Sequence, residues 1–160
     1  MSKLEALLHR LIEHDVEFVI IGAFASTMHG VTLVTRDVDI CCPFTSSGLL
    51  KLQVAIADLH PVHRLTPQRL PLQLTREKCQ GLKNLYLETD LGVLDCLSEV
   101  LGLGNFAAVE KQSVVIDADF GKCRVLGLDA LIKAKRAMNR PRDREALIQL
   151  EAIRGHQHRR

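Results

Sequence analysis

VIIGAFASTMHGVTLVTRDVDI, residues Val19 to Ile40, is the stretch from which the fold is predicted. It overlaps a short apolar run, Glu17 to Ile21, whose β-branched residues predict a buried strand. A helix is expected to open directly from that strand, from Gly22 through His29, with a glycine just after its end. Thr35 to Cys42 alternates polar and apolar residues and predicts a second strand, which Pro43 ends. The stretch therefore predicts a strand–helix–strand unit.

Two aspartates, Asp37 and Asp39, are separated by one residue on the second predicted strand. Side chains two positions apart on a strand point to the same face, so the two carboxylates should lie side by side. Their like charges repel, and hard oxygen ligands of this kind suit Mg²⁺ or Mn²⁺. The alternative is a solvent-exposed strand face that carries two acids without a cation.

The helix that opens at Gly22 predicts a phosphate site. A helix N-terminus offers free backbone N–H groups and the positive end of the helix dipole, and both favour an anion. Gly22 and Ala23 would supply these N–H groups. A phosphate cradle followed by paired carboxylates is a workable arrangement for a metal–nucleotide complex, although many strands also end in glycine.

A third carboxylate, Asp95, lies inside the apolar run Gly92 to Leu97. An acid in such a run is costly to bury unless it meets a cation or hydrogen-bond donors. If this strand lies beside the first pair, three aspartates could hold two divalent ions for phosphoryl transfer. The alternative is an edge-strand aspartate that faces water.

The remaining periodicities complete an α/β (α+β) domain, a mixed β-sheet flanked by helices with two helices at the C-terminal end. The expected elements are a helix from Ser2 to His14, a helix from Ser46 or Ser47 to about Leu59, strands at Leu70–Thr75, Leu82–Thr89 and Gly92–Leu97, a hairpin of Val114–Ile116 with Lys122–Leu126, and helices at Leu128–Met138 and from Pro141 to about Ile153. We expect a single domain over residues 1–155, followed by a frayed basic tail, residues 156–160.

Composition indicates a globular cytoplasmic protein. Of the 160 residues, 47% are hydrophobic and 25% charged, which argues against disorder. The five cysteines include no CxxC pair, so we expect reduced, buried thiols in a cytosol. The longest apolar stretch, Phe18 to Ala25, is too short to span a membrane, and no signal peptide is visible. We therefore expect no membrane partner.

Charge is unevenly distributed along the chain. The net charge is +2, but from Asp129 onward nine Lys and Arg face four Asp and Glu. A basic end on an acidic body suits an anionic ligand such as a nucleotide or RNA. A pair of solvated helices explains the same distribution equally well.

Together these residues resemble the nucleotidyltransferase superfamily of the DNA polymerase beta type. The family pattern is a hydrophobic strand, a glycine followed by Gly or Ser, an Asp-x-Asp after about ten to fifteen residues, and a third Asp on a later strand. Here it reads VIIGAFASTMHGVTLVTRDVDI and then LGVLDCL. The closest subgroup is the minimal bacterial AbiEii-like nucleotidyltransferases, which the His29-Gly30 and Thr35-Arg36 pairs also resemble. The ending LDALIKAKRAMNRPRDREALIQL carries the subgroup's Lys135, followed by its Arg142-Asp143 pair.

The resemblance implies roles for individual residues. The implied catalytic residues are Asp37, Asp39, Asp95 and Lys135, and the same three aspartates would bind the metal. The implied nucleotide-binding residues are Gly22, Ala23, Thr35, Arg36, Lys135 and Asp143. Arg36 is alternatively a salt-bridge partner of a neighbouring acid. Asp143 either orients Lys135 or caps the last helix. One departure is Ala23, which stands where relatives have Gly or Ser and so lacks a hydroxyl contact.

The implied function is transfer of a nucleoside monophosphate from an NTP such as ATP to a hydroxyl of a protein, a tRNA or a small molecule. The alternative is a catalytically weak or inactive binding module. It would act with a partner protein in a toxin–antitoxin or phage-defence pair. Because the chain is short, we expect a partner protein, a second copy or the basic C-terminal helices to hold the acceptor.

Overall fold

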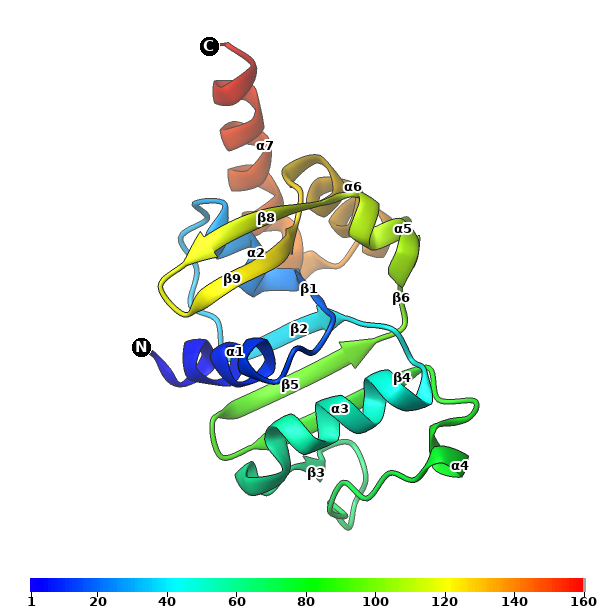
Figure 1. Cartoon of the computed structure of the whole chain (residues 1–160). Helices are drawn as coiled ribbons and strands as arrows, with labels where there is room; N and C mark the ends of the chain where they lie inside the picture. Colours follow the sequence, from blue (N-terminus) through cyan, green and yellow to red (C-terminus); the bar gives the residue numbers. More distant parts are fainter. Residues whose placement is uncertain (160) are drawn as a thin grey trace.

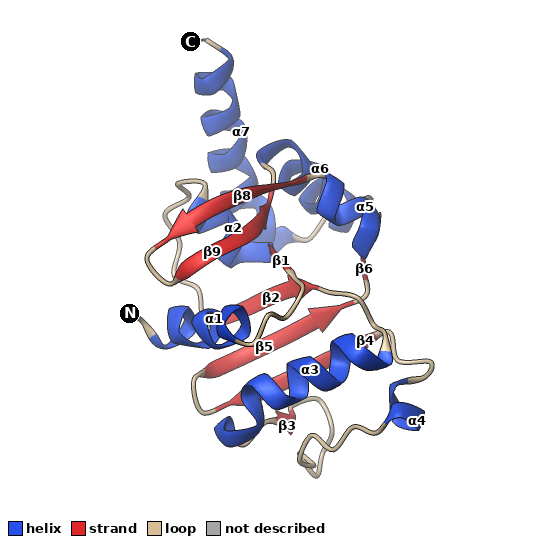
Figure 2. Ribbon diagram, in the orientation of Figure 1, coloured by secondary structure: helices blue, strands red, loops and turns tan. Residues whose placement is uncertain are grey.

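A seven-stranded mixed sheet forms the centre of the molecule. The computed structural model describes residues 1–159, and Figures 1 and 2 show the order of its elements. The strand order is β3-β4-β5-β2-β1-β9-β8, and β6 and β7 form a separate two-stranded sheet. The strands are β1 Val19–Ile21, β2 Asp37–Cys41, β3 Val62–His63, β4 Asn84–Thr89, β5 Gly92–Leu97, β6 Glu99–Val100, β7 Gly104–Asn105, β8 Ser113–Ala118 and β9 Gly121–Leu126.

Parallel and antiparallel pairs alternate around the middle of the sheet. β1 runs antiparallel to β2 and parallel to β9, and β2 runs parallel to β5. The outer pairs, β4 with β5, β3 with β4 and β8 with β9, are antiparallel. The predicted mixed sheet is therefore confirmed, and its central strands β1, β2 and β5 are the ones on which the site residues lie.

Helices cover both faces of the sheet. Figure 1 shows α1 and α3 in front of the strands, and α2, α6 and α7 behind them. The helices are α1 Lys3–Glu13, α2 Gly22–Met28, α3 Ser46–Ile56, α4 Arg76–Cys79, α5 Phe106–Lys111, α6 Leu128–Met138 and α7 Arg144–His158, with 3-10 turns η1 Ala57–Leu59 and η2 Pro141–Asp143. No helix in residues 1–159 is long and apolar enough to cross a membrane.

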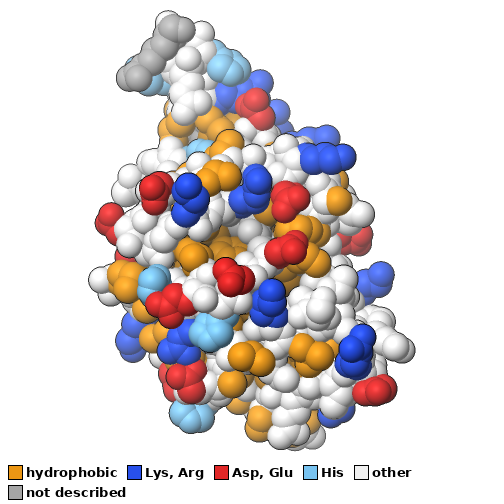
Figure 3. Space-filling model, in the orientation of Figure 1, with side chains coloured by type: hydrophobic (Ala, Val, Ile, Leu, Met, Phe, Trp, Pro, Cys, Tyr) orange, Lys and Arg blue, Asp and Glu red, His pale blue; other side chains and the backbone are white. Residues whose placement is uncertain are grey.

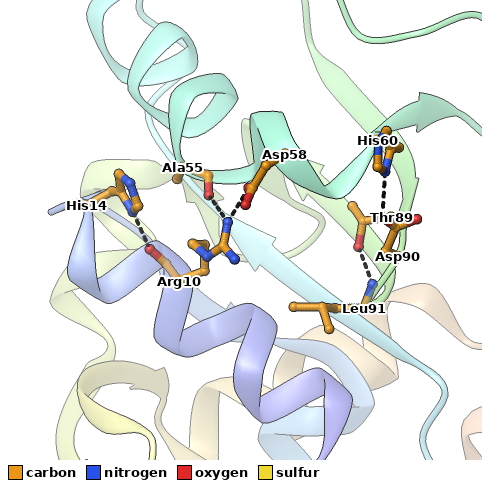
Figure 4. Close-up of polar contacts among 8 residues, drawn as sticks. All are labelled: Arg10, His14, Ala55, Asp58, His60, Thr89, Asp90 and Leu91. Carbon is orange, nitrogen blue, oxygen red and sulfur yellow. Dashed lines mark hydrogen bonds and ion pairs between the residues drawn. The ribbon is translucent and has the colours of Figure 1, made fainter.

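The first helix is held to the front face by its apolar stripe and by one arginine. Leu7, Leu8 and Leu11 recur at helical spacing and are fully buried. Arg10 Nη1 donates to the Ala55 carbonyl at 3.4 Å and also pairs with Asp58 (Figure 4). The contact joins α1 to the end of α3, so that the two front helices pack as a layer.

One predicted strand, Leu70 to Thr75, is wrong. The segment contains only an isolated bridge between Val62 and Pro71, and the strand beside β4 is the short β3. Pro71 has no N–H for a ladder. The N–H of Leu72 donates to the Pro61 carbonyl and that of Leu74 to the Gln53 side chain. The backbone groups are therefore paired outside a sheet.

Helix ends differ slightly from expectation. The N-cap of α3 is Thr45, whose hydroxyl accepts from the Gly48 N–H at 3.1 Å, and neither predicted serine fills that position. α6 has the predicted bounds and ends at Asn139 in the left-handed region. The break at Pro141 is a 3-10 turn, and α7 continues past the predicted end near Ile153 to His158. The helix thus includes most of the predicted frayed tail, and Arg160 lies outside the described residues.

Candidate active site

Three carboxylates converge where β2 and β5 lie side by side. In this parallel pair Asp39 is directly opposite Asp95, and Asp37 lies two residues earlier on the same face of β2. One carboxylate oxygen from each of the three lies within 4.8 Å of the others. Asp95 is only 7% exposed, so it is not an edge residue that faces water. The strand register therefore brings together the three predicted metal ligands.

Gly22 closes the site from the side of β1. Antiparallel pairing places Ile21 opposite Asp39, so the next residue, Gly22, begins α2 directly against that carboxylate. Gly22 has a φ of +70°, and a Cβ built there would contact Asp39 Oδ2 and lie 3.1 Å from Asp39 Cγ. Both the conformation and the space therefore require glycine.

The carboxylate cluster carries more negative charge than the protein around it neutralises. Burial and, after it, the charges of Asp37 and Asp95 together raise the pKa of Asp39 to about 7, against the opposing charges of Arg140 and Lys135. Three hard oxygen donors with an unbalanced charge fit a divalent ion such as Mg²⁺ or Mn²⁺.

The pKa of Asp39 predicts how the stability of the metal-free protein, kept so by a chelator, depends on pH. Its folded-state pKa, about 7, lies above the ordinary value of 3.8, so the folded state binds more protons between these values. Stability is therefore highest below about pH 4 for this group and falls as pH rises towards 7, by on the order of 4 kcal/mol. We expect Asp39→Asn to raise the melting temperature at pH 8 in EDTA and to change it little at pH 5. Equal effects of the substitution at both pH values would contradict this.

Lys135 and Arg140, whose charges act on Asp39, form an ion-pair network with Asp143. Lys135, 3% exposed, donates to Asp143 Oδ1 at 3.3 Å, and Arg140 Nε donates to Asp143 Oδ2 at 2.6 Å. Burial raises the pKa of Asp143, but its bonds to Arg140 and the charges of Lys135 and Arg140 outweigh this and lower it. Asp143 makes no side-chain capping bond to α7. Of its two predicted roles, the structure shows the contact that orients Lys135.

Two cationic side chains beside the carboxylates, Arg64 and Arg140, were not among the predicted site residues. Arg64, between β3 and β4, donates from Nε to Asp95 Oδ1 at 2.9 Å and from Nη2 to Oδ2 at 2.5 Å. Arg140 lies between the two C-terminal helices, and its Nε donates to Asp143. No motif marks Arg64 in the sequence. The one signal in the sequence is indirect, because an aspartate buried in an apolar run needs a cation or hydrogen-bond donors.

The other predicted nucleotide-binding residues lie at the edge of the site. Thr35 is half-buried and Arg36 exposed, in the loop just before Asp37. Within residues 1–159 Arg36 makes no hydrogen bond or ion pair, so its alternative role as a salt-bridge partner is not seen. Ala23 is half-buried on the first turn of α2. The nucleotide contacts of these three residues stay predictions.

The comparisons with known proteins agree with this architecture. No family model and no curated protein matches the chain. Among solved structures, a putative nucleotidyltransferase from Thermotoga maritima is 16% identical with a TM-score of 0.58, over 98% of this chain and 91% of that one. The lincosamide antibiotic adenylyltransferase LnuA, with lincomycin bound, is 12% identical with a TM-score of 0.64, over 94% and 96%. ANT(2")-Ia in complex with adenylyl-2"-tobramycin is 17% identical with a TM-score of 0.54, over 94% and 91%. At these identities the likeness concerns the fold, and the chain has the fold of nucleotidyltransferases, with a candidate aspartate triad at its site.

Proposed function

We propose that the protein is a metal-dependent nucleotidyltransferase that moves a nucleoside monophosphate from an NTP to a hydroxyl acceptor. The observation that carries the proposal is the meeting of Asp37, Asp39 and Asp95 on adjacent strands, with Gly22 packed against Asp39. In the proposed step the acceptor hydroxyl gives its proton to water, its oxygen bonds the α-phosphorus, and the bond from that phosphorus to the departing pyrophosphate breaks.

The three aspartates would hold Mg²⁺ or Mn²⁺, which when bound lowers the pKa of the attacking hydroxyl and stabilises the charge of the displacement. Arg64 already donates to both oxygens of Asp95, so we assign Asp95 to cation binding and not to proton abstraction. Lys135 and Arg140 place positive charge behind Asp39, where phosphate charge would gather.

The backbone N–H groups of Gly22 and Ala23 are assigned to the terminal phosphates, next to the carboxylates. Arg36 is exposed beside Asp37 and makes no ion pair within residues 1–159, which leaves its guanidinium available to the triphosphate. Thr35 precedes it and would contact the same ligand. Asp143 acts through Lys135, which it holds in place.

We propose ATP as the nucleotide and a small-molecule hydroxyl as the first acceptor class to screen. Two of the similar structures are an adenylyltransferase with lincomycin and a complex with adenylyl-2"-tobramycin, and both of these ligands are small molecules. A protein or a tRNA remains a further acceptor class. Basic and acidic side chains are interspersed on the face shown in Figure 3, which does not favour nucleic acid there.

A second candidate is a weakly active or inactive binding module of the AbiEii-like kind, working with a partner protein in a toxin–antitoxin or phage-defence pair or as a homo-oligomer. The observation that favours it is the bond of Arg64 to Asp95, together with Ala23 at the Gly-Gly or Gly-Ser step. For either function we propose a cytoplasmic location, because all five cysteines are free and buried.

Calorimetry with ATP, GTP, CTP and UTP, each with and without Mg²⁺, tests the proposal on the wild type and on Asp37→Asn. We expect Mg²⁺-dependent binding of at least one nucleotide, weakened by at least about tenfold in Asp37→Asn because the cation loses a ligand. A wild type that binds none of the four would contradict the enzymatic function and favour the binding module, and a pull-down for a partner would follow.

A further inference from the structure

Arg64 makes a paired contact with the third carboxylate of the triad. Its Nε and Nη2 donate to the two different oxygens of Asp95, at 2.9 and 2.5 Å, which is the bidentate geometry that arginine forms with carboxylates. The Arg64 side chain is 28% exposed and that of Asp95 10%. The contact is therefore largely shielded from water.

Tyr86 holds Arg64 in this position. The Arg64 N–H donates to the Tyr86 carbonyl at 3.0 Å, and the guanidinium carbon lies 5.6 Å from the centre of the Tyr86 ring. Tyr86 is itself directly opposite Asp95 in the β4–β5 pair. Backbone pairing and a cation–π contact thus direct a loop arginine across one strand onto the carboxylate.

The guanidinium and a divalent ion need the same carboxylate. A carboxylate oxygen can accept from a donor and still bind an ion, so the two are not mutually exclusive by lone-pair count. Their charges, however, have the same sign, and an ion bound to Asp95 at about 2.1 Å would lie beside the Arg64 nitrogens. Within residues 1–159 neither Asp37 nor Asp39 forms an ion pair, and Arg64 bonds to Asp95 alone of the three.

We infer that Arg64 is a built-in counter-ion that competes with divalent cations for Asp95. In the metal-free protein it neutralises the buried third carboxylate, and it leaves the pair Asp37 and Asp39 to receive the first cation. The charge of Arg64 weakens cation binding by Asp95, so this positioning residue sets the cation concentration at which all three aspartates take part. The inference rests on the proposed metal-dependent function.

Binding of Mn²⁺, measured by calorimetry and by the electron paramagnetic resonance signal of the free ion, tests the competition without any assay of activity. The variants are Arg64→Gln, which removes the charge, and Arg64→Lys, which keeps the charge but not the paired bonds. The matched control is Arg69→Gln, which removes an arginine of the same loop that pairs with Glu88. We expect Arg64→Gln to bind Mn²⁺ at least about tenfold more tightly or to take up a second ion, with Arg64→Lys intermediate and Arg69→Gln unchanged.

Melting temperatures supply a second measurement on the same proteins. In EDTA, Arg64→Gln should melt below the wild type because Asp95 is left buried without a partner, and Mn²⁺ should raise its melting temperature by more than it raises that of the wild type. If Arg64→Gln does not fold in EDTA, restoration of its folding by Mn²⁺ supports the inference. If Mn²⁺ does not restore folding, the Mn²⁺ affinity of Arg64→Lys is compared with that of the wild type instead.

Wild-type affinity in both Arg64 variants would overturn the inference and leave the proposed function standing. No binding of Mn²⁺ by the wild type or by any variant would overturn both, whereas binding gained only in Arg64→Gln supports the inference.

Discussion

Gly22→Ala should destabilise the protein by about 2–4 kcal/mol and weaken Mn²⁺ binding by at least about tenfold, from backbone strain plus overpacking. Gly22 has a φ of +70°, which an L side chain rarely adopts, and the added Cβ would contact Asp39 Oδ2 and approach Asp39 Cγ to 3.1 Å. The Asp39 side chain would have to move, and the cation would lose a ligand. Urea unfolding and Mn²⁺ calorimetry measure the two effects.

Gly81→Ala is the matched control for this prediction. Gly81 has a φ of +79°, close to that of Gly22, but a Cβ there would meet nothing within 4 Å. The control should therefore show the backbone strain alone, about 1–2 kcal/mol, with Mn²⁺ affinity unchanged. If Gly22→Ala lost no more stability than Gly81→Ala and kept its Mn²⁺ affinity, the close packing of Gly22 against Asp39 would have no role in the site.

Asp143→Ala should lower the free energy of unfolding by about 3 kcal/mol or more, because it leaves a buried ammonium without its hydrogen-bonding partner. Lys135 is 3% exposed, and Asp143 accepts both from Lys135 and from Arg140. An exposed ion pair gives the comparison: Glu151→Ala breaks a pair with Arg136 whose side chains are 42% and 56% exposed. That change should cost no more than about 1 kcal/mol.

A second substitution separates loss of charge pairing from loss of packing. Adding Lys135→Met to Asp143→Ala removes the unpaired charge at similar volume, so the double variant should be more stable than Asp143→Ala alone. The measurement is urea unfolding at pH 7 for the single and double variants. A double variant less stable than Asp143→Ala would show that Lys135 stabilises the fold through contacts other than Asp143.

The carboxylate triad was predictable because each part of it depends on local sequence. Alternation along a strand places Asp37 and Asp39 on one face, and the apolar run around Asp95 marks another buried strand. The pairing of β2 with β5 answers the question that the sequence left open, namely whether that strand lies beside the first, and it brings one oxygen of each carboxylate within 4.8 Å of the others. The failed strand, Leu70 to Thr75, shows the limit of the same method: apolar alternation around Pro71 suggested pairing, but its amides find partners elsewhere.

The sequence determined the elements that carry the chemistry, because strand and helix periodicity, glycine at a strand–helix junction and proline breaks are local properties of the chain. Only the tertiary structure decided which charges meet. Arg64 and Asp95 lie 31 residues apart, and Gly22 touches Asp39 across two antiparallel strands. No local pattern encodes such contacts, since they depend on strand order and register, which are set by packing of the whole sheet between its two layers of helices. Asp143 illustrates both: the sequence placed it in the first turn of the last predicted helix, but its pairing with buried Lys135 depends on the fold.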